Sequence, residues 1–140
     1  MKKLPYGISN YEKIVEENRI YVDKTMLISQ VNRRIRTEQK FLCVSRPRRV
    51  GKSMAADMLS AYYNCSEDTS ALFENLKITS VESFREHLNQ YHVIKINMQM
   101  FLSGTSSVEE MLNILQMRVL RDLKRAYPDF VDGDSLIWAM

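Results

Sequence analysis

The sequence predicts an α/β fold in which helices accompany a parallel sheet. Two short apolar runs support this prediction, residues 41–44 (FLCV) and residues 93–97 (VIKIN). The first run is apolar on both faces, as a strand inside a parallel sheet must be. Helical stretches lie between and after the two runs, and strands that alternate with helices are typical of a parallel sheet.

Helices are predicted over residues 11–17, 24–36, 52–63, 81–89 and 107–126. Apolar residues recur at helical spacing in the longer ones. Two of these helices begin after side chains that can accept hydrogen bonds from free N–H groups. Asp23 precedes the second helix, and Ser106 with Glu109 has capping-box spacing at the start of the last. Pro128 ends that last helix, because proline cannot continue it.

The composition is that of an ordinary globular protein. Of 140 residues, 45% are hydrophobic and 26% are charged, which fits one domain or part of one and excludes disordered and fibrous classes. The two cysteines, Cys43 and Cys65, form no Cys-x-x-Cys or Cys/His pattern, so no disulfide framework or zinc site is expected. No stretch approaches the roughly 20 apolar residues of a membrane span. We therefore expect no membrane partner and a cytoplasmic location.

The segment SRPRRVGKS, residues 45–53, carries the strongest functional signal. It follows the apolar run 41–44 and leads into the helix that begins at Gly51-Lys52-Ser53. A strand, a basic turn and a helix N-terminus in this order are the layout of a phosphate-binding loop. The free N–H groups at the start of such a helix face an anion. The segment therefore predicts binding of a nucleoside triphosphate.

Each position of this loop has a chemical role in the prediction. Gly51 lets the main chain approach the phosphates, which a Cβ would hinder. Lys52 reaches the β- and γ-phosphate oxygens as a point charge, and the Ser53 hydroxyl ligates a Mg²⁺ ion that bridges two phosphate oxygens. Backbone N–H groups complete the cradle. With ATP and Mg²⁺ as the ligands, the predicted binding residues are Arg48, Arg49, Val50, Gly51, Lys52, Ser53 and Met54.

Two features of the loop leave a plainer interpretation open. Arg46 stands where the pattern G-x-x-x-x-G-K-S requires glycine, and Pro47 removes one backbone donor. Gly-Lys-Ser alone occurs by chance in many chains. The alternative is that Gly51 only starts a surface helix, with Lys52 in solvent.

Basic residues near the loop provide an alternative from another class. A net charge of +3 permits a polyanionic partner without requiring one. In this alternative the protein is a nucleic-acid or protein interaction module without nucleotide turnover. The side chains concerned are Arg33, Arg34, Arg36, Arg46, Arg48 and Arg49. No basic groove with interleaved aromatic residues, of the kind that favours single-stranded nucleic acid, is visible in the sequence.

Several stretches, taken in order, resemble the bacterial AAA-ATPase-like family. They are LPYGI (residues 4–8), YVDKT (21–25), RPRRVGKS (46–53), LFENLKI (72–78) and YHVI (91–94). The loop resembles the family's Arg-Pro-Arg-Arg-Phe-Gly-Lys-Ser, with Val50 in place of Phe. The family's loop also has arginine at the position of Arg46, so the resemblance accounts for the missing glycine there. Asn75 replaces the Gly of the family's Leu-Phe-x-Gly-Leu-Lys-Ile. The resemblance spans nearly the whole chain.

This resemblance implies a P-loop NTPase-like three-layer sandwich of the additional-strand type, in which the parallel sheet is incomplete. It also implies a Walker A loop, with ATP as its ligand. It implies that residues 1–140 are the N-terminal part of a single domain. Residues 1–39 would be a family-specific extension and residues 40–140 the P-loop core. Longer relatives often continue into a nuclease-like C-terminal domain, which is the partner that the resemblance suggests.

One departure from the family concerns hydrolysis. The family's next strand, the Walker B strand, ends in an Asp-Glu-Tyr-Asp element that positions Mg²⁺ and the attacking water. Here the run 93–97 ends in Asn97, and Asp129, Asp132 and Asp134 lie in a turn-like stretch. Hydrolysis needs a held metal and an oriented nucleophile. We therefore expect the chain to bind ATP as part of a larger ATPase, with little or no hydrolysis by this chain alone. The alternative is that the chain is a truncated, inactive remnant of such an ATPase.

Overall fold

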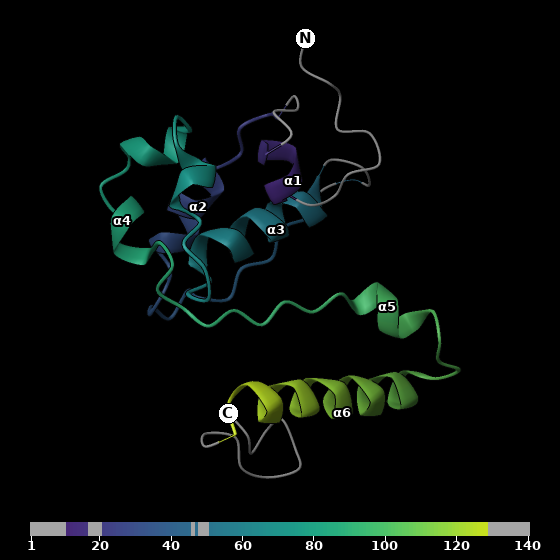
Figure 1. The fold of residues 1–140 in the computed structure, drawn as a ribbon. Helices are drawn as coiled ribbons and strands as arrows, with labels where there is room; N and C mark the ends of the chain where they lie inside the picture. The colour runs from purple at the N-terminus through teal and green to yellow at the C-terminus, as the bar shows by residue number, and fades with distance from the viewer. Residues whose placement is uncertain (1–10, 17–20, 46, 48–50, 129–140) are drawn as a thin grey trace. The chain divides into compact units, whose positions relative to one another are not determined.

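The computed structural model describes residues 11–16, 21–45, 47 and 51–128 (Figure 1). The chain divides into two compact units, Met1–Ile94 and Lys95–Met140. All regular elements in the described residues are α-helices or 3₁₀-helices. The predicted division into an extension (residues 1–39) and a core (residues 40–140) stays a prediction.

The first unit contains short helices around one longer helix, α3. In chain order they are α1 (Tyr11–Glu16), α2 (Met26–Asn32), α3 (Lys52–Tyr63), the 3₁₀-helices η1 (Ser70–Phe73) and η2 (Lys77–Ser80), and α4 (Phe84–His87). Helix α1 packs against α3 and η1, while α2 and α4 both pack against η2. Figure 1 shows α1, in purple, lying against α3, in teal.

Aromatic side chains form the centre of the core in the first unit. The ring of Tyr62 lies 4.7 Å from the ring of Tyr63 and 5.6 Å from that of Phe73, both edge-on. Aromatic pairs at this spacing add attraction beyond the area they bury. The other buried apolar residues of this cluster are Tyr11, Ile28, Met58, Ala61, Ile78 and Phe84. The core therefore joins side chains from α1, α2, α3, both 3₁₀-helices and α4.

Asn89 holds the C-terminal end of α3. Its backbone N–H donates to the carbonyl of Tyr62 at 2.8 Å, and its side-chain Nδ2 donates to the carbonyl of Asn64 at 2.7 Å. The same Nδ2 lies 3.0 Å from Oγ1 of Thr69. Because the last carbonyls of a helix have no partner inside the helix, these bonds satisfy that end and fasten two loops to it.

The predicted parallel sheet is absent from the described residues. Neither residues 41–44 nor residues 93–97 form a strand, and the described chain contains only an isolated parallel bridge between Asn64 and Tyr91. Phe41 is 87% exposed and Ile94 is 49% exposed, so these apolar side chains face solvent. The prediction of an α/β, P-loop NTPase-like three-layer sandwich with an incomplete parallel sheet is therefore wrong.

The reason is that a strand depends on a partner. An apolar run becomes a strand only where a second run pairs with its N–H and C=O groups, and the described residues provide no such pairing. In addition, Asn97 acts as a helix cap. Its Oδ1 accepts a hydrogen bond from the N–H of Gln99 at 3.1 Å, which starts a helix where the second strand was predicted to end.

Most predicted helices are present but shorter. Helix α3 begins at Lys52, directly after Gly51, and ends at Tyr63 as predicted. Helix α2 covers only Met26–Asn32 of the predicted 24–36, and α4 covers only Phe84–His87 of the predicted 81–89. Helix α3 therefore has the predicted bounds, whereas α2 and α4 are shorter than predicted.

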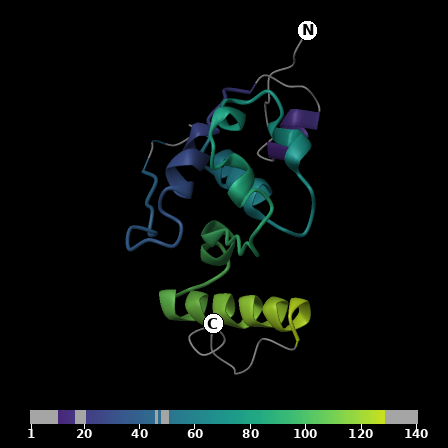
Figure 2. The ribbon, with the colours of Figure 1, turned by 90° about the vertical axis from the view of Figure 1, so that its left-hand side faces the viewer.

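The second unit contains α5 (Met98–Leu102) and the long helix α6 (Val108–Ala126), which Figure 2 shows as one straight helix in green to yellow. The capping box of α6 lies one residue later than predicted. The N–H of Glu110 donates to Oγ of Ser107 at 3.1 Å, and Glu110 Oε2 accepts from the N–H of Ser106 at 2.9 Å. The start of α6 is therefore held by Ser107 and Glu110, and Ser106 takes part through both its N–H and its hydroxyl.

Two further sequence expectations concern cysteines and membranes. Both cysteines are free and exposed, including Cys43, which was expected within a buried strand. In the part of the chain that the structure describes, every helix is too short or too polar to cross a bilayer.

Candidate functional site

Gly51 makes the turn that leads into α3. Its φ is +81°, in the left-handed region that residues with a Cβ rarely adopt. The hydrogen bond that closes the first turn runs from the N–H of Ala55 to the carbonyl of Gly51, at 3.0 Å. N–H groups in a first helical turn have no acceptor inside the helix. The start of α3 therefore presents backbone donors and the positive end of the helix dipole.

The side chain of Lys52 reaches back to Pro47. Its Nζ donates a hydrogen bond to the carbonyl oxygen of Pro47 at 3.0 Å. Ser53 is exposed in the first turn of α3, whereas Met54 is partly buried against the core. The structure thus places a positive charge and a hydroxyl group at the same end of one helix.

The predicted binding residues fall into two groups. Gly51, Lys52, Ser53 and Met54 are described, and they share the N-terminal end of α3. The other predicted residues lie outside the described residues; they are Arg48, Arg49 and Val50, and Arg46 of the same loop lies outside as well. The contact of all seven predicted residues with a nucleotide stays a prediction.

A second lysine, for which the sequence predicts no role, lies at the same place. The Nζ atom of Lys24 is 3.1 Å from the position that a Cβ on Gly51 would occupy. Lys24 belongs to residues 21–25, which precede α2 and correspond to the YVDKT stretch. The resemblance of residues 21–25 to the family predicts no particular contact for Lys24.

Asp23 anchors this segment instead of capping α2. Its Oδ1 accepts hydrogen bonds from the N–H of Thr25 at 2.8 Å and from Oγ1 of Thr25 at 2.6 Å. Its Oδ2 accepts from the N–H of Lys77 at 2.8 Å, at the start of η2. Oγ1 of Thr25 in turn accepts from the N–H of Ile78 at 3.2 Å. The segment that carries Lys24 is therefore tied to η2 on both sides of that lysine.

The hydrogen bonds also set the charge of Asp23. Desolvation by partial burial raises its pKa, but the bonds from the Thr25 side chain and from the N–H groups of Lys77 and Thr25 outweigh it and lower the pKa below the usual value. These hydrogen bonds therefore stabilise the ionised form of the carboxylate.

Comparison with models of protein families identifies the family. The model of a family described as Predicted AAA-ATPase matches residues 5–136. The chain belongs to this AAA-ATPase-like family. Comparisons with curated proteins and with solved structures gave no significant match. Membership in the family supports nucleotide binding in general.

The described residues of this AAA-ATPase-like chain suit a phosphate ligand. Gly51 leaves open the space that a Cβ would fill, and the Lys52 ammonium lies 3.0 Å from the Pro47 carbonyl. No cluster of three or more His, Cys, Asp or Glu side chains that could hold a metal occurs in the described parts of the chain. A Mg²⁺ ion is often held by few protein groups together with substrate phosphates, and Ser53 is placed to be one of those groups.

Two arginines considered for nucleic-acid binding make contacts within the AAA-ATPase-like chain itself. Arg34 Nη1 donates to the carbonyl of Gln30 at 2.7 Å, one turn earlier. The guanidinium carbon of Arg36 lies 5.9 Å from the centre of the Tyr91 ring, a cation–π arrangement. These contacts give both arginines a structural role.

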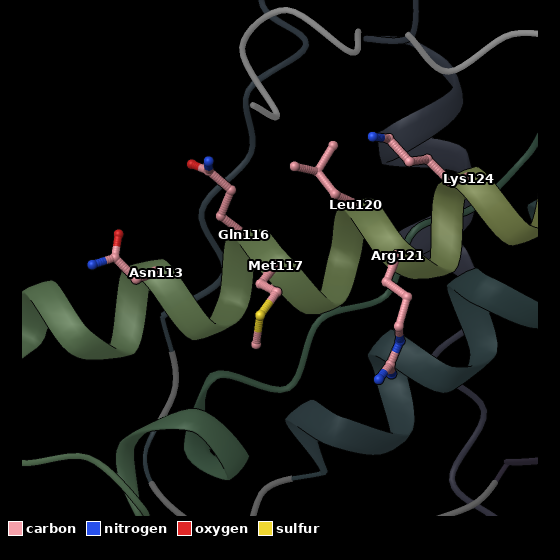
Figure 3. Close-up of a pocket in the computed structure, with 6 residues that line it drawn as sticks. All are labelled: Asn113, Gln116, Met117, Leu120, Arg121 and Lys124. Atoms are coloured by element: carbon pink, nitrogen blue, oxygen red, sulfur yellow. The ribbon is translucent and has the colours of Figure 1, made fainter. Parts of the chain in front are cut away.

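A hollow also lies along α6, in the second unit. Its lining residues all come from this one helix: Asn113, Gln116, Met117, Leu120, Arg121 and Lys124. Figure 3 shows Gln116, Leu120 and Lys124 on one side of the helix, and Met117 with Arg121 on the other. The polar side chains among them do not converge on a common point, and a ligand pocket requires such convergence. The candidate site in this AAA-ATPase-like protein is therefore the start of α3.

Proposed function

We propose that this AAA-ATPase-like protein binds ATP together with Mg²⁺ through residues 48–54. The observation that carries the proposal is the position of Lys52. Its ammonium group lies 3.0 Å from the Pro47 carbonyl, while its backbone begins α3. Lys52 is exposed, so its ammonium group is accessible to a ligand at this end of the helix.

The chemistry of the proposed complex follows from the groups at this helix end. Backbone N–H groups of the first turn donate to phosphate oxygens, and the helix dipole favours their negative charge. Lys52 exchanges its bond to the Pro47 carbonyl for bonds to the β- and γ-phosphates, because a charged oxygen is the stronger acceptor. The Ser53 hydroxyl ligates the Mg²⁺ ion that bridges two phosphate oxygens.

We propose binding, rather than turnover, as the activity of these residues, within a larger ATPase. Hydrolysis requires acidic groups that hold Mg²⁺ and a residue that orients the attacking water. In the residues that the structure describes, no group of three or more His, Cys, Asp or Glu side chains is placed to hold a metal ion. Release of inorganic phosphate during incubation with Mg²⁺-ATP measures turnover separately from binding.

Titration with Mg²⁺-ATP tests the binding site. Lys52→Ala removes the ammonium group that lies next to the Pro47 carbonyl. We expect at least a tenfold weaker affinity for Mg²⁺-ATP, which corresponds to about 1.4 kcal/mol. Lys40→Ala is the matched control, since Lys40 is an exposed lysine whose Nζ lies over the ring of Phe41. Equal affinity of the wild type and Lys52→Ala would contradict the proposal.

A further inference from the structure

Two lysines from separate parts of the chain meet at Gly51. Lys52 directly follows this glycine, whereas Lys24 comes from the segment ahead of α2. The Nζ atom of Lys24 lies 3.1 Å from the Cβ position of Gly51, a distance that a real Cβ could tolerate only if one of the two groups moved. The absence of a side chain at this position therefore allows the Lys24 ammonium group to come close to the main chain of the loop.

The position of Lys24 is determined by its neighbours on both sides. Asp23 bonds to the N–H of Lys77, and Thr25 is fully buried and accepts from the N–H of Ile78. Both bonds join the segment to η2, and together they fix the direction in which the intervening residue leaves the chain. Asp23 and Thr25 therefore act as positioning residues for Lys24.

The surroundings of Gly51 suit one class of ligand. Two ammonium groups and the N–H groups of a first helical turn all donate hydrogen bonds, and each carries full or partial positive charge. A chain of phosphates offers several charged acceptor oxygens within a few ångströms, so it can satisfy donors that approach from different directions. A single carboxylate offers only two oxygens.

We infer that Lys24 is a second phosphate-binding residue and that, with Lys52, it contacts the triphosphate of the bound nucleotide. This inference rests on the proposed ATP site and adds a residue from a distant segment to it. The Lys24 ammonium lies next to Gly51, and the Lys52 ammonium lies next to the Pro47 carbonyl. The triphosphate is thereby held between two charges that belong to different segments of the chain.

The test compares four variants of the full chain in competition against a fluorescent ATP analogue with Mg²⁺. Lys24→Met keeps most of the side-chain length without the charge, and Lys24→Arg keeps the charge. Lys52→Ala tests the underlying site, and Lys40→Ala is a control for removal of an exposed lysine. ATP and inorganic triphosphate serve as competitors, because triphosphate carries the charges without the nucleoside. Thermal unfolding of each variant checks the fold.

We expect Lys24→Met to weaken competition by both ATP and inorganic triphosphate by roughly three- to tenfold, as for loss of a hydrogen bond to a charged group that is partly screened. Lys24→Arg should keep most of the affinity. The difference between the wild type and Lys24→Met should shrink at high salt, because salt screens exposed charges. A purely structural role of Lys24 would produce neither the recovery by Arg nor the salt dependence.

Other outcomes overturn the inference in distinguishable ways. If Lys52→Ala weakens ATP binding and Lys24→Met does not, Lys24 is not a phosphate-binding residue, although the proposed function stands. If Lys24→Arg binds as weakly as Lys24→Met, or Lys24→Met weakens ATP without affecting inorganic triphosphate, the charge contact is absent. If the wild type binds neither ATP nor triphosphate, the proposed function and this inference both fail.

Discussion

The carboxylate of Asp23 and the backbone N–H of Lys77 lie 2.8 Å apart and form a hydrogen bond that fastens residues 21–25 to η2. Asp23 Oδ1 accepts from Thr25 at the same time, so both oxygens of the carboxylate are engaged. Since α2 packs on η2 and Lys24 reaches Gly51, this one side chain links the fold of the first unit to the candidate site.

Replacing Asp23 by Asn should destabilise the protein. The amide keeps one oxygen for Thr25 but places an NH₂ donor opposite the N–H of Lys77, so one of the two contacts must break. We expect a loss of about 1 kcal/mol in the free energy of unfolding, since the site is only partly buried. Urea denaturation measures the loss.

Asp68→Asn provides the matched control for this substitution. Asp68 is exposed, and its carboxylate accepts from the N–H of Ser70 at 3.0 Å and from the side chain of the same serine. Asn retains such an oxygen, so the control should unfold close to the wild type. If the two variants are equally stable, the bond between Asp23 and Lys77 contributes nothing.

The stabilising effect of Asp23 should disappear in acid. The folded state lowers the pKa of its carboxyl below the ordinary value of 3.8, so the folded protein binds this proton less readily than the unfolded chain does. Its contribution is therefore complete above pH 3.8 and is lost as the pH falls through the lowered folded-state value. The difference in unfolding free energy between the wild type and Asp23→Asn should narrow over this acid range; a constant difference contradicts the assignment.

The accuracy of the helix predictions follows from how local each signal is. Helix α3 has an apolar stripe that includes Met58 and Tyr62, and a glycine with positive φ at its start, so nearby residues alone determine its bounds. The start of α6 was predicted one residue early because Ser106 and Ser107 are adjacent and both are followed, three residues later, by Glu. Only the structure shows which pair is used.

The sheet failed as a prediction because strand pairing is not a local property. Residues 41–44 are apolar, but apolar character describes a preference for burial and does not identify a partner strand. Phe41 is 87% exposed in the structure. Burial on both faces was inferred from composition alone, and nothing in the described chain covers this run.

The candidate site was predictable only in part for a related reason. Gly51, Lys52 and Ser53 are consecutive, so their spacing revealed them. Lys24 reaches Gly51 through a contact between distant segments, and no spacing rule connects the two. The tether between Asp23 and Lys77 was also missed, because an aspartate ahead of a helix is usually its cap.

Gly51→Ala should cost stability through the backbone. A residue with a Cβ at φ +81° costs roughly 1–2 kcal/mol, and the new methyl group would also lie 3.1 Å from Lys24 Nζ. Gly104→Ala is the control, because a Cβ there meets nothing within 4 Å and its φ lies outside the left-handed region. Chemical denaturation of both variants should show a loss for position 51 alone; equal losses would contradict the strain assigned to Gly51.

Asn32→Ala should be among the more damaging substitutions in the first unit. Asn32 is buried; its Oδ1 accepts from the hydroxyl of Tyr63 at 2.5 Å, and its Nδ2 donates to the hydroxyl of Tyr62 at 3.2 Å. Removing the amide leaves the Tyr63 hydroxyl without this acceptor in the core. We expect a loss of about 2 kcal/mol in the free energy of unfolding, whereas Gln30→Ala, on the exposed side of α2, should change it little.

A double substitution tests the cause of that loss. Asn32→Ala combined with Tyr63→Phe removes both partners, so no hydroxyl is left without its acceptor. The double variant should therefore lose less than the sum of the two single losses. Strict additivity would show that the bond between Asn32 and Tyr63 does not contribute.

Ser107→Ala should weaken the start of α6 in the second unit. Oγ of Ser107 accepts from the N–H of Glu110 at 3.1 Å, and an alanine leaves that first-turn donor to water. Loss of such a cap costs about 1 kcal/mol. Amide hydrogen exchange over residues 108–112 should become faster in this variant. Ser106→Ala is the control: its backbone N–H still donates to Glu110 Oε2, 2.9 Å away, so only the side-chain bond to that oxygen is lost. A larger effect from Ser106→Ala than from Ser107→Ala would show that Ser106 is the capping residue, as the sequence predicts.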